Sequence, residues 1–137
     1  MYMQARRALL MTVAVVGSAI ASQHAGAHHS FAAEFDVKRP VEFTGKVVKV
    51  EFINPHSWIH LEVERNGTRE IWMVEGGSPN ALIRKGITKQ SIPVGAELSV
   101  VGYQARDGRN RAVGRTLQFA DGKPLFFDST KVPDPVE

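Results

Sequence analysis

The sequence predicts a mostly β fold, a five-stranded and partly open barrel like the OB-fold with one short helix between its third and fourth strands. Segments rich in β-branched and aromatic residues recur along the chain, and glycines, prolines and asparagines separate them. The clearest of these segments alternates apolar and polar residues with the period of a half-buried strand. The order of three strands, a helix and two strands is that of an OB-fold, and an α+β roll or a small sandwich with a helical plug is the alternative.

This alternation and the turn residues define the strands. In the second strand, Ile59, Leu61 and Val63 alternate with polar or aromatic neighbours. Asn66 and Gly67 follow that strand, and because both residues tolerate positive φ they predict a tight hairpin turn. The predicted strands are residues 43–53, 57–64, 68–75, 97–105 and 111–119.

A short helix is predicted over residues 78–86, between the third and fourth strands. Ser78 can cap its first turn, Pro79 suits the first helical position, and Gly86 can end it. The two glycines just before Ser78 are interpreted as a tight strand-to-helix connection, since no lysine follows as in a phosphate-binding loop.

The chain divides into four parts on this interpretation. Residues 1–27 are predicted to be a secretory signal peptide. Residues 28–42 are predicted to be an irregular arm, because Pro40 breaks any helix that begins there. Residues 43–128 form the OB-like barrel domain, and the proline-rich residues 129–137 form a flexible tail.

The signal peptide is predicted from three features. Arg6 and Arg7 give a positive start, residues 8–21 form an uncharged apolar run, and residues 25–27 read Ala-Gly-Ala, a small-residue cleavage site. The run is too short to span a bilayer. We therefore expect a periplasmic or secreted protein without stable membrane insertion after processing. A second cleavage site after Ala21 is less suitable, because no polar stretch would separate it from the apolar run.

Composition excludes several kinds of partner and site. Removing 27 of the 137 residues, with two of the 17 basic residues and none of the 14 acidic ones, leaves a mature net charge of +1. Together with export, this balance disfavours nucleic acid as a partner. The chain has no cysteine, so it has neither a disulfide nor a thiolate metal site.

The positions of the histidines suggest a metal site. After cleavage His28 would be the first residue, and its α-amine and imidazole Nδ1 can chelate one ion. His56, in a proline-containing turn, would complete a set of three nitrogens, which suits Cu(II). His29 is an alternative ligand to His28, and Glu34 or Asp36 could add an axial oxygen. The competing interpretation is that these are ordinary polar residues of a cleavage region and a turn.

Weaker functional hypotheses concern Glu75, the two tryptophans, His60 and a group of arginines. Glu75 could orient a metal-binding histidine as its carboxylate partner. Trp58 and Trp72 could form a ligand-binding face on the barrel, although they could equally cover the arm or a small second core. His60 is interpreted as a surface histidine rather than a ligand. The arginines near residues 106–115 are interpreted as a solvated hairpin tip.

Two functional hypotheses follow from these residues. The first is a small metal-binding module, a Cu(II) carrier or buffer with a possible periplasmic or membrane protein partner. The alternative is a module that binds a small ligand or a partner protein through the tryptophan face, without metal. A copper-dependent redox enzyme is disfavoured, because a short domain with one exposed site offers little surface for a substrate.

The chain resembles an uncharacterised family of small exported bacterial proteins, a domain of unknown function. The resemblance rests on three motifs, HHSFAAEFD at residues 28–36, NPHSW at 54–58 and EGGSPN at 75–80, and covers nearly all of the mature chain. It implies a periplasmic location and a compact β domain, and it supplies no activity. His60 departs from the pattern, in which an aromatic residue such as tyrosine is expected.

A second resemblance concerns the site alone. The proposed arrangement of His28 and His56 is similar to the copper-binding histidine brace of periplasmic copper carriers and lytic polysaccharide monooxygenases. No other motif of those proteins is present, so the similarity implies a shared kind of site and not a shared ancestry.

Overall fold

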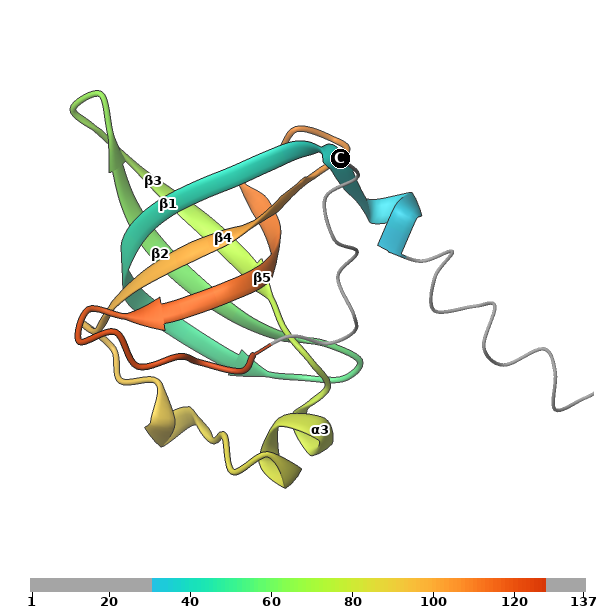
Figure 1. Cartoon of the computed structure of the whole chain (residues 1–137), viewed down its shortest axis with the longest axis vertical. Helices are drawn as coiled ribbons and strands as arrows, with labels where there is room; N and C mark the ends of the chain where they lie inside the picture. Colours follow the sequence, from blue (N-terminus) through green and yellow to red (C-terminus); the bar gives the residue numbers. More distant parts are fainter. Residues whose placement is uncertain (1–30, 128–137) are drawn as a thin grey trace, which may run out of the picture. The chain divides into compact units, whose positions relative to one another are not determined.

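In the computed structural model, which describes residues 31–127, five strands form one sheet that closes on itself in the order β1-β2-β3-β5-β4 (Figure 1). The prediction of a mostly β fold with five strands is confirmed. Four of the five strand pairs are antiparallel, and β3 pairs with β5 in parallel. The elements are β1 (Phe35–Phe52), β2 (Ser57–Arg65), β3 (Thr68–Glu75), helix α3 (Pro79–Arg84), the 3₁₀ helix η1 (Lys89–Ser91), β4 (Glu97–Ala105) and β5 (Arg111–Phe119).

Strand β1 begins earlier than predicted. It starts at Phe35 and not near residue 43, so the prediction of an irregular arm is wrong for residues 35–42. This first part of β1 pairs with β4, and the pairing register shifts between Phe35 and Pro40. A bulge lets a strand contain a proline, because the residue without an N–H need not donate to the ladder.

The compact unit that contains the closed sheet begins at Glu34. The domain therefore starts before residue 43, which was the start predicted from the sequence. The predicted signal peptide and tail, and the histidines His28 and His29, lie outside the described residues.

The predicted hairpin turn and helix are both present. Asn66 and Gly67 have φ values of 52° and 75°, as the tight turn between β2 and β3 requires. The Ser78 side chain caps α3 by accepting a hydrogen bond from the Ala81 N–H at 3.3 Å. Gly86 follows the helix with a φ of 77°, which glycine adopts without strain. The short helix η1 was not predicted.

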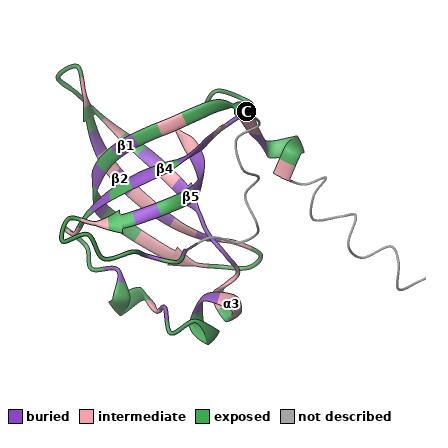
Figure 2. Ribbon diagram, viewed as in Figure 1, coloured by how far each residue is buried: buried purple, intermediate pink, exposed green. Residues whose placement is uncertain are grey.

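The core lies inside the closed sheet, and buried residues alternate with exposed ones along the strands (Figure 2). In β2, Ile59 and Leu61 are fully buried, as their alternation predicted. The segment from α3 to β4 contributes Leu82, Ile87 and Ile92 to the same core. The helical segment therefore closes the core between the third and fourth strands, where the sequence placed it.

Candidate functional site

The candidate site lies on the outer face of the sheet, where β2, β3 and β5 meet. Trp58 of β2 is directly opposite Glu75 of β3, so these two side chains share a face. The neighbouring Val74 is completely buried in the core, which directs Glu75 to the other face. We call Glu34, His56, Trp58, Glu75 and Arg111 the outer-face cluster, because ion pairs, a cation–π contact and electrostatic interactions join them.

His56 and Glu75 form a contact within this cluster. His56 Nδ1 lies 3.0 Å from Glu75 Oε1, and the side chains are 42% and 6% exposed respectively. Among the described residues, neither His56 Nδ1 nor Glu75 Oε2 has a hydrogen-bond partner. The contact is therefore mainly electrostatic. The predicted pairing of Glu75 with a histidine is present, and it involves His56.

Burial controls the ionisation of Glu75. Loss of solvent raises the pKa of its carboxyl above the ordinary value, and His56 and Arg111 oppose this while Glu34 adds to it. A buried carboxylate with an unsatisfied oxygen is costly unless a positive or hydrogen-bonding group is near it. The nearby charges of His56 and Arg111 therefore lower the cost of ionising Glu75.

Arg111 joins three distant segments of the chain. Its guanidinium carbon lies 5.0 Å from the centre of the Trp58 ring, a distance at which a cation and an aromatic face attract. Its Nη2 lies 3.5 Å from Glu34 Oε2. The Glu34 carbonyl also accepts a hydrogen bond from the Arg106 N–H at 2.9 Å. Residues from all three sequence motifs thus meet at one place.

The two predicted accessory carboxylates have other contacts. Glu34, suggested as an axial ligand, pairs with Arg111. Asp36 accepts a hydrogen bond from the Lys38 N–H at 3.0 Å, within the part of β1 where the pairing register shifts. In the basic hairpin, Arg109 pairs with Asp107 at 2.8 Å, whereas Arg111 belongs to the outer-face cluster.

The predicted tryptophan face is wrong for Trp72. Trp72 is 2% exposed and lies in the core, with its ring 4.7 Å from that of Phe43. Its indole N–H donates to Glu70 at 3.2 Å. It lies opposite Leu61, whereas Trp58 lies opposite Glu75, so the two tryptophans are on opposite faces of the sheet. Trp58 alone is available to the outer face.

His60, predicted to be a surface histidine, is largely covered and has a carboxylate partner. Its side chain is 15% exposed, and Nε2 lies 2.7 Å from Glu51 Oε2. Lys49 contacts the other oxygen of Glu51 at 2.6 Å. Hydrogen bonds from Lys49 and then from His60 lower the pKa of Glu51. The face therefore has a second histidine–carboxylate pair, which sequence analysis missed because Glu51 and His60 belong to different strands.

The strand-to-helix connection after Glu75 is as tight as predicted. The Gly76 N–H donates to the Ser57 carbonyl at 2.8 Å, and the Gly77 N–H donates to the Phe127 carbonyl at 2.9 Å. A Cβ atom at Gly76 would lie 2.2 Å from a ring carbon of Phe127. Only glycine fits this position, which fixes the end of β3 and hence the place of Glu75.

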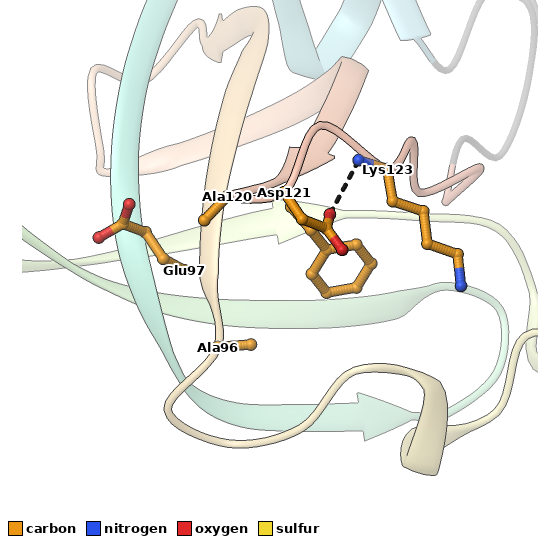
Figure 3. Close-up of a pocket in the computed structure, with 6 residues that line it drawn as sticks. Ala96, Glu97, Ala120, Asp121 and Lys123 are labelled. Atoms are coloured by element: carbon orange, nitrogen blue, oxygen red, sulfur yellow. Dashed lines mark hydrogen bonds between the residues drawn. The ribbon is translucent and has the colours of Figure 1, made fainter.

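A surface hollow of about 390 Å³ lies elsewhere on the domain (Figure 3). In it Asp121 accepts a hydrogen bond from the Lys123 N–H at 2.9 Å. The hollow shares no residue with the outer-face cluster, and its lining residues are Ala96, Glu97, Phe119, Ala120, Asp121 and Lys123.

Two features are absent from residues 31–127, a cluster of metal-binding side chains and a membrane-spanning helix. Within that range, no group of three histidine, cysteine, aspartate or glutamate residues converges to hold a metal ion. No helix within the range has the length and apolar character needed to cross a membrane.

Comparison with known proteins adds a family to this description. No curated protein matches the chain. A protein-family model described as "Family of unknown function (DUF6152)" matches residues 15–115, which include β1 to β4, His56, Glu75 and Arg111. Because the match covers well over half of the 137 residues, the chain belongs to DUF6152, a family of unknown function.

Proposed function

We propose that this chain is an exported, OB-like copper-binding module that works in the periplasm or outside the cell. After removal of residues 1–27, the α-amine and Nδ1 of His28 would bind Cu(II) together with His56. The protein would carry or buffer the ion, or pass it to a periplasmic or membrane partner. The observation that carries the proposal is the half-exposed His56 ring. Its Nδ1 contacts the carboxylate of the buried Glu75.

This contact suits a metal-binding histidine. A histidine that binds a metal through one ring nitrogen commonly has a carboxylate or carbonyl beside the other, which fixes the ring and raises its basicity. Glu75 contacts Nδ1, so Nε2 of His56 is the nitrogen that would bind copper. The negative charge of Glu75 would also stabilise a copper-bound ring, since the carboxylate is otherwise poorly compensated.

The start of the described chain supports the use of His28. Glu34 lies beside Arg111, which contacts Trp58, two residues from His56. The six residue steps from Glu34 back to His28 can span at most roughly 20 Å when fully extended. The proposed ligand set requires that this segment bring the His28 nitrogens beside His56.

The strand order supports the OB-like description. Each of the first three strands pairs with the next, and the helix α3 lies between β3 and β4. β1 pairs with β4, and β3 pairs with β5, which closes the sheet. This is the connectivity expected of a five-stranded OB barrel.

The test is copper titration of protein recovered after export. Its intact mass and N-terminal sequence are measured first, because a chain beginning at Ser22 would lack the His28 amine as a donor. Isothermal titration with Cu(II) then compares the wild type with His28→Ala and His56→Ala, and Ile71→Leu, at an exposed position of β3, is the control. We expect the first two variants to lose affinity and the control to keep it.

Two results would contradict the proposal. Unchanged Cu(II) affinity in His56→Ala would exclude this histidine as a ligand. An EPR spectrum without hyperfine structure from several nitrogens would exclude the three-nitrogen ligand set.

A further inference from the structure

The metal-binding side chains of the described domain gather on one face. Residues 31–127 contain two histidines, His56 and His60, and one methionine, Met73. His60 of β2 is directly opposite Met73 of β3. Trp58, which is two residues from His60 in β2, lies on the same face. The domain thus places an imidazole, a thioether and an indole at neighbouring positions of the sheet.

His60 is oriented as a metal ligand would be. Its Nε2 lies 2.7 Å from Glu51 Oε2, in hydrogen-bond contact. When Nε2–H donates to Glu51, Nδ1 carries the lone pair that can bind a metal. A carboxylate in this position fixes the tautomer and raises the basicity of the ring. The ring is also only 15% exposed, which limits competition from water.

The register places the methionine within reach. Side chains directly opposite on neighbouring antiparallel strands have Cβ atoms about 4.5–5.5 Å apart. The long side chain of Met73, which is partly buried, can place its sulfur beside the His60 ring from there. Thioether and imidazole together are soft and borderline ligands, and a thioether selects Cu(I) over harder cations.

The charges around this pair are balanced. Lys49 is paired with Glu51 at 2.6 Å. Arg111, opposite Met73 on β5, is paired with Glu34 and lies over Trp58. Lys49 and Arg111 therefore each have a carboxylate partner. A singly charged metal ion adds the least repulsion to such a surface.

We propose that His60 and Met73 form a Cu(I) site beside Trp58, with Glu51 as the positioning residue for His60. The site needs neither His28 nor His56, so it stands or falls separately from the proposed Cu(II) site. If both exist, the same face holds copper in both oxidation states, with Trp58 between the two histidines.

The test is Cu(I) affinity measured without oxygen against a coloured Cu(I) chelator. Met73→Leu keeps the volume of the side chain and removes only the sulfur, and Ile71→Leu, on the same face of β3, is its control. We expect Met73→Leu and His60→Ala to weaken Cu(I) binding by more than about tenfold, and Glu51→Gln by about tenfold or more. His56→Ala should leave Cu(I) affinity unchanged.

X-ray absorption of the Cu(I)-loaded protein gives an independent measurement. We expect a copper–sulfur shell in the wild type that disappears in Met73→Leu. Equal Cu(I) affinity in Met73→Leu and the wild type would overturn the site, as would a spectrum with nitrogen and oxygen neighbours only. If the wild type binds Cu(I) as proposed but does not bind Cu(II), the proposed function is refuted and the Cu(I) site is not.

Discussion

Replacement of Gly76 by alanine should destabilise the domain through one identifiable contact. The new Cβ would lie 2.2 and 2.3 Å from two ring carbons of Phe127 and 2.6 Å from the Phe127 carbonyl oxygen. An ordinary contact begins near 3.4 Å, so the ring would have to move by about 1.2 Å. Phe127 is completely buried, and its carbonyl accepts the Gly77 N–H, so it cannot move without disturbing the core and this connection.

The size of the effect follows from the two ways to relieve the contact. If the ring stays and the core is overpacked, the cost is about 1–3 kcal/mol. If the ring leaves the core, the loss approaches that of a buried phenylalanine, about 3–5 kcal/mol. We expect about 3 kcal/mol, because both the ring and the backbone of Phe127 are affected. That is a large part of the total stability of a small domain, about 5–15 kcal/mol.

Urea unfolding followed by tryptophan fluorescence measures this cost, and a double-mutant cycle with Phe127→Ala identifies its origin. In the Phe127→Ala background, Gly76→Ala should cost less than in the wild type, because the ring is absent and only the contact with the backbone carbonyl at position 127 remains. Gly86→Ala is the control. Gly86 has a positive φ and open space around it, so its alanine variant should cost about 1–2 kcal/mol whether or not Phe127 is present. A cost for Gly76→Ala below 1 kcal/mol, or strict additivity with Phe127→Ala, would refute the reasoning.

Three further predictions concern the cap, the tryptophans and the buried carboxyl. Ser78→Ala removes the N-cap of α3 and should lower the free energy of unfolding by about 1 kcal/mol, measured by urea denaturation; an unchanged midpoint would contradict the cap's role. Cu(II) should quench the fluorescence of the Trp72→Phe variant and leave that of Trp58→Phe nearly unchanged, because only Trp58 is near the proposed site; the reverse pattern would place copper elsewhere. The raised pKa of Glu75 means that the metal-free folded state holds its proton more tightly than the unfolded state, so this carboxyl should cost stability as the pH rises from about 4.5 through the folded pKa. Glu75→Gln should remove that loss, and a wild type that gains stability relative to this variant between pH 4.5 and 7 would show the opposite sign.

Local features of the fold could be predicted from the sequence because neighbouring residues decide them. The Asn66-Gly67 turn depends on two residues that tolerate positive φ. The start of α3 depends on one hydroxyl and the N–H three residues later. The strand alternation that buries Ile59 is equally local, since successive side chains of a strand point to opposite faces.

The start of β1 and the environment of Trp72 required the tertiary structure. Phe35 is in a strand because Ala105, seventy positions away, provides its partner, and no local pattern contains that information. In β3, Ile71 and Trp72 are both apolar, so alternation alone does not show which of them is buried. The pairing of Trp72 with the fully buried Leu61 decides it.

The sequence by itself indicated that the fold is mostly β, and it singled out His56 and Glu75 as candidate site residues. Only the tertiary structure decided which groups meet, because a closed sheet brings strands together by register and not by order in the chain. It placed Glu75 beside His56 and Arg111 over Trp58, and it set Met73 opposite His60. A site on a sheet face is built across strands, and its partners are separated in sequence by the length of the loops between them.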